Sequence, residues 1–188
     1  MDHLLSAIRH PDVSVGQSAF LAIDGLGASG KSTLATLLSG KLGAEIIRLD
    51  DFSGPEPFSW MPRLRAEILE PVSRGATSLT YQPESWWGQT PPPVTDQPVT
   101  PVMIVEGVGS HHPELRAFWR VTIFVDTPAT LCLERGVARD LATGEPESAI
   151  RRQWEAWQAE ELTYLAEHDP AAHVDFIVKG DVPFDTQV

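Results

Sequence analysis

Cysteine is nearly absent from this sequence. Its single cysteine, Cys132, cannot form a disulfide within the chain, so nothing indicates an oxidising compartment. The neighbours of Cys132 are apolar and predict the buried side of a helix, which favours a packed side chain over a reactive thiol. The sequence also lacks the basic head and apolar stretch of a secretory signal. We therefore expect a cytoplasmic protein.

Long apolar runs and positive charge are scarce as well. No apolar run approaches the roughly 18 residues that suggest a membrane span. Lys and Arg number 14 against 26 Asp and Glu, which gives a net charge of −12. Such a surface repels phosphate backbones and anionic membranes, so we expect neither nucleic acid nor membrane as a partner. A bound phosphate must then be held by a local binding motif. Only three lysines occur, Lys31, Lys41 and Lys179, so a lysine within such a motif is a distinctive signal.

Length and pattern predict a single α/β domain covering residues 1–188. Short apolar runs alternate with segments of helical spacing, which is typical of a parallel sheet with helices on both faces. The expected strands are 18–24, 44–49, 102–105, 120–125 and 174–178. The expected helices are 2–10, 31–42, 62–73, 129–141 and 147–168. The prediction is thus a five-stranded parallel sheet with helices on both faces, carrying a small lid at about 139–151.

One stretch, residues 82–101, is rich in proline and contains Trp86 and Trp87. Regular structure is not expected in it. Two tryptophans are unusual in a linker, so the stretch is interpreted as an ordered surface loop on the acceptor side.

A phosphate-binding loop follows the first expected strand. Its residues match the spacing G-x-x-x-x-G-K-[ST] and are Gly25, Leu26, Gly27, Ala28, Ser29, Gly30, Lys31 and Ser32, with Thr33 next in the helix. Glycines let backbone N–H groups curl around a polyphosphate, and the helix N-terminus adds a favourable dipole. Lys31 would neutralise the β- and γ-phosphates, and the Ser32 hydroxyl would hold Mg²⁺. The loop therefore predicts a P-loop NTPase that binds ATP with Mg²⁺.

Carboxylates follow two of the other strands. Asp50 and Asp51 come at the end of the second strand, and Glu106 ends the third. The carboxyl ends of parallel strands meet at one crevice, which would put an aspartate beside the γ-phosphate as a proton acceptor. Glu106 would contact Mg²⁺. The alternatives are a solvated turn for the aspartates and a structural carboxylate for Glu106.

Two arginines, Arg135 and Arg139, lie four residues apart late in an expected helix, so they share one face. They would clamp the transferring phosphoryl group, with residues 143–146 in the lid. The alternative is a helix C-terminus decorated with cations.

These segments, in this order, resemble the uridine kinase-like family of P-loop small-molecule kinases, which includes nicotinamide riboside kinases. The resemblance lies in residues 23–34, 49–52, 105–107 and 124–140. It implies Asp50 as general base, with a slip to Asp51 left open, and Glu106 as the residue that assists the metal. It also implies that Arg135 and Arg139 stabilise transfer.

The acceptor end departs from the family pattern. Uridine kinases carry a Tyr-Asp segment followed by a His and an Arg that read the nucleoside, whereas residues 81–87 here are Tyr-Gln-Pro-Glu-Ser-Trp-Trp. Asp51, Tyr81 and Trp86 remain candidate substrate contacts, with a tryptophan stacking on a ring. Tyr81 and the tryptophans have the alternative role of anchoring the loop.

The sequence thus predicts a kinase acting on the hydroxyl of a small molecule, with a nucleoside as the expected acceptor. A nucleoside monophosphate kinase is one alternative, because Arg63, Arg65 and Arg74 could hold an acceptor phosphate. A regulatory ATP-binding module without an acceptor is another. The choice between ATP and GTP, and assembly into a homo-oligomer, stay open.

Overall fold

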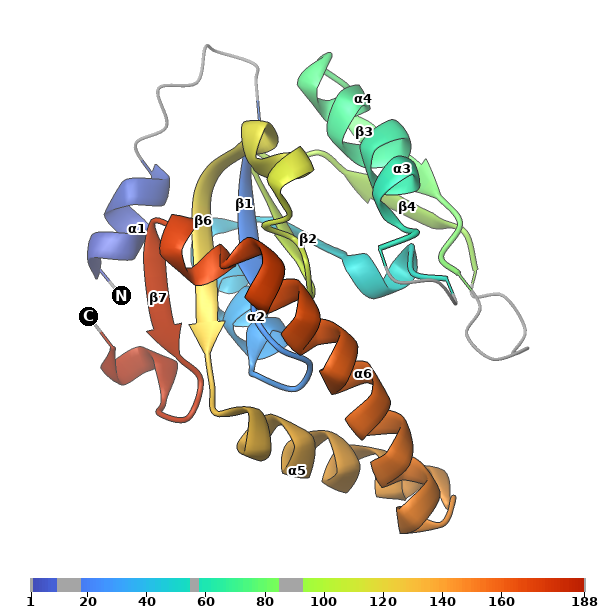
Figure 1. Ribbon diagram of the computed structural model, residues 1–188. Helices are drawn as coiled ribbons and strands as arrows, with labels where there is room; N and C mark the ends of the chain where they lie inside the picture. The colour runs from blue at the N-terminus through green and yellow to red at the C-terminus, as the bar shows by residue number, and fades with distance from the viewer. Residues whose placement is uncertain (1, 10–17, 55–57, 85–92, 188) are drawn as a thin grey trace.

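The computed structural model describes residues 2–9, 18–54, 58–84 and 93–187, built around a parallel sheet (Figure 1). The sheet has five strands in the order β2-β5-β1-β6-β7, and every neighbouring pair is parallel. In that order the strands are Glu45–Arg48, Val102–Glu106, Ala19–Asp24, Trp119–Asp126 and Phe176–Lys179. All residues of β1 and β5 are buried, as expected for central strands covered on both sides. The predicted five-stranded parallel sheet is confirmed.

Alternate side chains of the strands enter two separate cores. Leu21 of β1 and Ile104 of β5 join the core beneath α1 (Asp2–Arg9) and α2 (Lys31–Leu42). Phe20 and Met103 face the opposite way, into the core beneath a second helical layer. That layer is one run of three segments: α3 (Met61–Leu64), a π-helical turn (Arg65–Leu69) and α4 (Glu70–Ser73).

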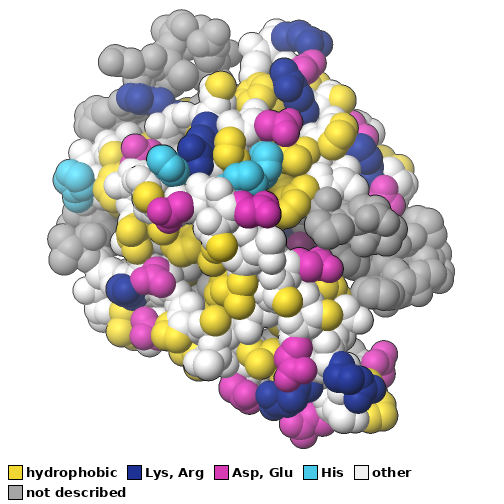
Figure 2. Space-filling view, in the orientation of Figure 1, with side chains coloured by type: hydrophobic (Ala, Val, Ile, Leu, Met, Phe, Trp, Pro, Cys, Tyr) yellow, Lys and Arg dark blue, Asp and Glu magenta, His cyan; other side chains and the backbone are white. Residues whose placement is uncertain are grey.

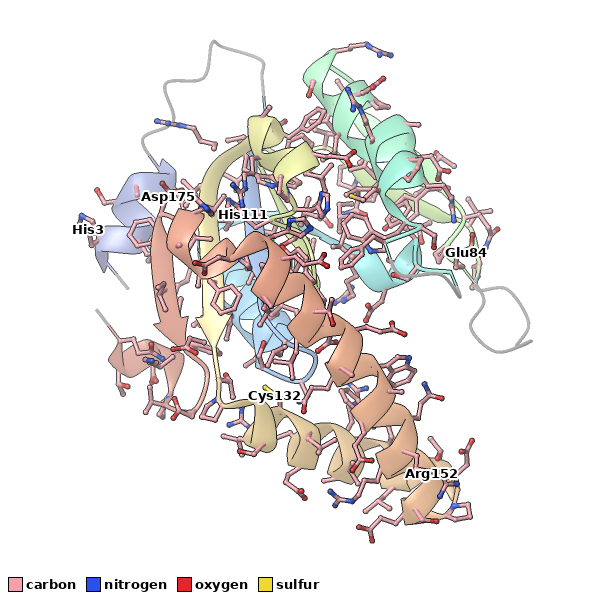
Figure 3. The ribbon with its side chains drawn as sticks, viewed as in Figure 1. His3, Glu84, His111, Cys132, Arg152 and Asp175 are labelled. Atoms are coloured by element: carbon pink, nitrogen blue, oxygen red, sulfur yellow. The ribbon has the colours of Figure 1, made fainter. Side chains whose placement is uncertain are left out.

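Two helices form an arm: in Figure 1 the first lies below the sheet, and the second runs from the front of the sheet down to the first. They are α5 (Ala129–Asp140) and α6 (Glu147–His168), joined through a 3₁₀ turn at Leu141–Thr143. This arm contains the segment predicted to be a lid. Cys132 is fully buried on α5 (Figure 3), and burial raises the pKa of its thiol to about 11, so it stays protonated at neutral pH.

The structure differs from the sequence prediction in the proline-rich stretch. Residues Thr95–Pro98 form strand β4, which pairs antiparallel with β3 (Ser78–Tyr81), so the expectation of irregular structure is wrong there. Leu79 and Tyr81 of β3 point into the core while their neighbours are exposed, and this alternation stabilises a short pair. Proline is tolerated because the ribbon has only two strands and hence only edges. Trp86 and Trp87 lie outside the described residues.

Short 3₁₀ turns complete the fold at Leu49–Asp51, Pro113–Phe118, Pro170–His173 and Phe184–Thr186. Within the described part of the chain, none of the helices has the length and apolar character needed to cross a membrane.

Candidate active site

The phosphate-binding loop joins β1 to α2 through a backbone path that requires glycine. Gly25 has a φ of 141°, and a Cβ there would lie 2.6 Å from the carbonyl oxygen of Val125. Gly25, Leu26 and Ser29 are buried at the base of the loop. The loop's other residues line a cavity of about 910 Å³: Gly27, Ala28, Gly30, Lys31, Ser32 and Thr33.

Lys31 is folded back over this loop. Its Nζ donates to the carbonyl oxygens of Gly25 at 2.9 Å and Leu26 at 2.7 Å, and the residue is only 7% exposed. The ammonium group is thus held at the mouth of the loop, where it lines the cavity. Its position suits neutralisation of a polyphosphate.

Asp24, the last residue of β1, fixes the start of the loop and is fully buried. Its Oδ1 accepts from the N–H groups of Gly25 (2.7 Å) and Gly109 (2.9 Å). Its Oδ2 accepts from the N–H of His111 (2.9 Å) and the hydroxyl of Tyr164 (2.7 Å). Burial and the Asp24 charge raise the pKa of Tyr164, which keeps its proton. One carboxylate therefore joins the loop, the turn after β5 and helix α6.

Ser32 and Glu106 both line the cavity and are hydrogen-bonded to each other. The Ser32 hydroxyl donates to Oε1 of Glu106 at 3.0 Å, and the Arg48 guanidinium lies 3.8 Å from the same oxygen. Burial is the main cause that raises the pKa of Glu106, while Lys31 and Ser32 act in the opposite direction. A hydroxyl beside a carboxylate offers the hard oxygen donors that Mg²⁺ prefers. Among the described residues no group of three or more His, Cys, Asp or Glu side chains is placed to hold a metal ion.

A tight turn after β2 carries both predicted aspartates but separates them. Asp50 lines the cavity beside Ser53, whereas Asp51 does not line it. Asp51 lies 3.5 Å from the hydroxyl of Tyr81, and burial is the largest cause that raises its pKa. Gly107, on the facing strand's end, leaves room for this turn, because a Cβ there would lie 2.6 Å from the Cβ of Leu49.

The structure places Tyr81 behind the site. Its ring stacks on Phe52 at 5.0 Å, and its hydroxyl lies 3.3 Å from Oε1 of Gln97. Burial and the nearby Asp51 raise the pKa of Tyr81 to about 12. Tyr81 does not line the cavity, and Trp86 falls outside the described residues.

Both predicted arginines of α5 reach the cavity. Arg135 donates from Nη1 to the carbonyl oxygen of Gly180 at 2.9 Å. The guanidinium of Arg139 lies 5.1 Å from the centre of the Trp154 ring and donates to Asp140. Figure 2 shows that the basic side chains at the lower tip of the molecule lie among acidic ones.

Sequence reasoning missed several residues that line the cavity. From α6 come Trp154, Trp157 and Glu161, and Glu161 accepts the backbone N–H of Gly27 in the phosphate-binding loop. No sequence signal marks that glutamate, since it belongs to a helix with many charged residues. Further lining residues that the sequence did not indicate include Phe58, Trp60 and Glu84. We call the part of the cavity that is lined by Asp50, Ser53, Phe58, Trp60 and Glu84 its acceptor end.

No protein-family model matches the sequence, and no curated protein matches it. Solved structures do match the fold. A protein described as a possible uridine kinase from Bacillus stearothermophilus gives a TM-score of 0.65 at 21% identity, over 94% of this chain and 95% of that one. A protein provisionally assigned as a fructose transport system kinase from Silicibacter sp. TM1040 gives 0.71 at 21% identity, over 94% and 97%.

An uncharacterised protein from Eubacterium ventriosum gives a TM-score of 0.51 at 12% identity, over 90% of this chain and 92% of that one. At these identities the likeness shows a shared fold. The predicted resemblance is confirmed at that level: this chain has the fold of P-loop kinases, and uridine kinase-like proteins are among its structural neighbours.

Proposed function

We propose that this protein is an ATP- and Mg²⁺-dependent kinase that phosphorylates a hydroxyl group of a small molecule, with a nucleoside as the acceptor class. The observation that carries the proposal is the shared cavity. It brings Lys31 and Ser32 of the phosphate-binding loop together with Glu106 and Asp50. The loop follows β1, Glu106 ends β5 and Asp50 follows β2, so the groups come from the ends of three strands. These are the groups that phosphoryl transfer to a hydroxyl requires.

Each group has one role in the proposal. Mg²⁺-ATP, when bound, supplies the phosphoryl group and neutralises part of its charge. Ser32 and Glu106 would hold the metal, and Lys31 would bind the β- and γ-phosphates. Asp50 would accept the proton of the acceptor hydroxyl at a carboxylate oxygen as that hydroxyl attacks.

Arg135 and Arg139 would stabilise the charge of the transferring group from the side of the lid. Both already line the cavity and both have partners that hold their side chains near it. Residues 139–151 would close over the nucleotide as the arm moves.

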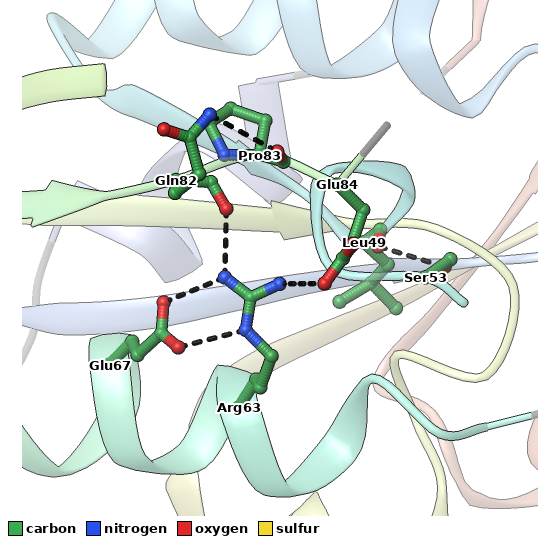
Figure 4. A network of polar contacts seen from close by, with 7 residues as sticks. All are labelled: Leu49, Ser53, Arg63, Glu67, Gln82, Pro83 and Glu84. Carbon is green, nitrogen blue, oxygen red and sulfur yellow. Dashed lines mark hydrogen bonds and ion pairs between the residues drawn. The ribbon is translucent and has the colours of Figure 1, made fainter. Parts of the chain in front are cut away.

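A nucleoside monophosphate kinase is less well supported, because the candidate phosphate-binding arginines are engaged. Arg63 contacts two glutamates (Figure 4), and both Arg65 and Arg74 pair with Glu70. None of these three arginines is among the described residues that line the cavity. An acceptor phosphate at this end would face Asp50 instead, and like charges repel.

The three predicted substrate contacts are proposed to act in different ways. Asp51 and Tyr81 support the turn that carries Asp50, so we propose an indirect part for them in acceptor binding. A contact from Trp86 remains a prediction from the sequence.

An ADP-release assay tests the function. Mg²⁺-ATP is supplied with a panel of nucleosides, nucleoside monophosphates, vitamin-like alcohols and sugar alcohols, and Lys31→Ala serves as the inactive control. Strong stimulation by an uncharged hydroxyl compound, absent in the control, is the expected result. Slow hydrolysis that no compound stimulates would favour the regulatory ATP-binding module and contradict the proposal.

A further inference from the structure

Glu84 stands at the acceptor end of the cavity and is fixed there by its backbone. It follows β3, and its N–H donates to the carbonyl oxygen of Asp51 at 2.7 Å. That bond ties Glu84 to the turn that also carries Asp50. The side chain of Glu84 lines the cavity and is partly open to solvent, on the side of the lobe formed by β3 and α3 (Figure 3).

The Glu84 carboxylate is also held by a side chain, as Figure 4 shows. Arg63 donates from Nη1 to Oε1 of Glu84 at 2.6 Å. The same guanidinium donates to both carboxylate oxygens of Glu67, at 2.8 and 3.0 Å, and to the carbonyl oxygen of Gln82 at 2.8 Å. A guanidinium with this many partners has a fixed orientation, so Glu84 is pre-positioned by it.

The charge of this cluster is negative. One arginine faces two glutamates, which leaves a net charge of −1, and Asp50 adds another carboxylate at the same end of the cavity. Among the described residues that line the cavity, the basic ones are Lys31, Arg135 and Arg139, and none of these belongs to the acceptor end. An anionic acceptor bound at this end would therefore face the carboxylates of Asp50 and Glu84, while the Arg63 guanidinium is already paired with two glutamates.

Two aromatic side chains also line this end of the cavity. Phe58 and Trp60 line the cavity, and their rings contact each other edge to face with centres 6.2 Å apart. Aromatic side chains beside a fixed carboxylate suit a ligand that has a flat ring and hydrogen-bond donors.

We propose that Glu84 is a specificity-determining residue that reads the acceptor. Its carboxylate accepts a hydrogen bond from an O–H, an N–H or a positively charged nitrogen of an uncharged or cationic, ring-bearing acceptor. It excludes anionic acceptors, such as phosphate monoesters and carboxylates. This inference rests on the proposed kinase function and names the class of its second substrate.

The first arm of the test varies the charge of the acceptor. The wild-type protein is assayed with the best acceptor from the panel and with derivatives of it that carry a carboxylate or a quaternary nitrogen on the ring. We expect kcat/KM for the carboxylate form to be at least about 100-fold lower than for the uncharged form. An equal or higher value would overturn the inference while leaving the kinase function intact. If no compound is phosphorylated at all, the proposed function itself fails and the inference falls with it.

The second arm compares Glu84→Gln with the matched control Glu67→Gln. Each variant removes one of the two carboxylates that bind Arg63, but only Glu84 lines the cavity. We expect Glu84→Gln to raise the acceptor KM about tenfold or more and to leave the ATP KM unchanged. The ratio of kcat/KM for the uncharged acceptor to kcat/KM for its carboxylate derivative should also become smaller. Glu67→Gln should change the acceptor KM by about twofold at most.

Equal effects of the two variants would contradict a reading role for Glu84 and indicate a purely structural one. Melting temperatures of both variants are measured alongside the kinetics. If Glu84→Gln does not fold, the wild-type acceptor series alone decides.

Discussion

The carboxylate of Glu161 accepts the backbone N–H of Gly27, with Oε2 2.9 Å from the nitrogen. This bond connects α6, the second helix of the arm, to the phosphate-binding loop, although the two residues are 134 positions apart in sequence. A negative charge therefore lies against the loop that is proposed to bind phosphates. Burial is the main cause that raises the pKa of Glu161, and the Gly27 bond and Lys31 only partly offset it.

The first prediction concerns nucleotide affinity. Replacing Glu161 with Gln keeps an oxygen for the Gly27 N–H but removes a charge that repels phosphates. We expect Mg²⁺-free ADP to bind Glu161→Gln about 3- to 10-fold more tightly than wild type, as measured by calorimetric titration. Glu155→Gln removes an exposed glutamate of the same helix that does not line the cavity, so it is the control and should change affinity less. Weaker binding to Glu161→Gln would mean that the charged form supports the loop geometry.

A second prediction concerns stability against pH for the same variant. Because the folded-state pKa of Glu161 is raised, the folded protein holds more protons than the unfolded chain at pH values between the ordinary value of 4.5 and the raised one. The contribution of Glu161 to stability therefore falls as pH rises through that window. Glu161→Gln should melt at a higher temperature than wild type at pH 7.5, and the difference should shrink as the pH falls toward 4.5. A difference that stays constant over this range would contradict the argument.

The identity of the proton acceptor gives a third prediction. Asp50 lines the cavity, whereas Asp51 is bound to Tyr81 outside it, so Asp50→Asn should lower kcat by at least about 100-fold and leave ADP affinity nearly unchanged. Asp51→Asn has the same change in charge one position along and is the matched control. It should lower kcat by less than Asp50→Asn does. The reverse order of the two variants would place the base at Asp51.

Much of the fold could be predicted from the sequence, because the signals are local. The run from Ile23 to Leu34 contains an apolar strand, a loop with a defined spacing and a helix, and each part depends on neighbouring residues. Strand β4 was missed because its stability comes from pairing with β3 and not from its own composition, which includes Pro98.

The candidate site was predictable where residues belong to the ends of strands. Asp50 and Glu106 follow apolar strands directly, so their place at one edge of the sheet follows from the topology. Glu84 and Glu161 reach the cavity through tertiary contacts, with Arg63 and Gly27 respectively, and such contacts leave no local pattern. For the same reason the sequence could not separate Asp50 from Asp51.

The last prediction tests how the arm is packed, using two glycines inside helices. A Cβ on Gly136 of α5 would lie 2.5 Å from ring atoms of Trp154 on α6, whereas a Cβ on Gly40 of α2 would meet nothing within 4 Å. Both positions gain helix propensity when glycine becomes alanine, by about 0.5–1 kcal/mol. At Gly40 no steric clash opposes the gain in helix propensity, so Gly40→Ala should raise the free energy of unfolding by about 0.5–1 kcal/mol.

At Gly136 the gain is outweighed, because Trp154 must move away and the contact between the two helices opens. We expect Gly136→Ala to lower the free energy of unfolding by about 1–3 kcal/mol, measured by urea denaturation. Arg139 lies over the same tryptophan ring, so the displacement should also weaken ADP binding, which Gly40→Ala leaves unchanged. If both substitutions stabilise the protein equally, the close contact between Gly136 and Trp154 does not hold the arm together.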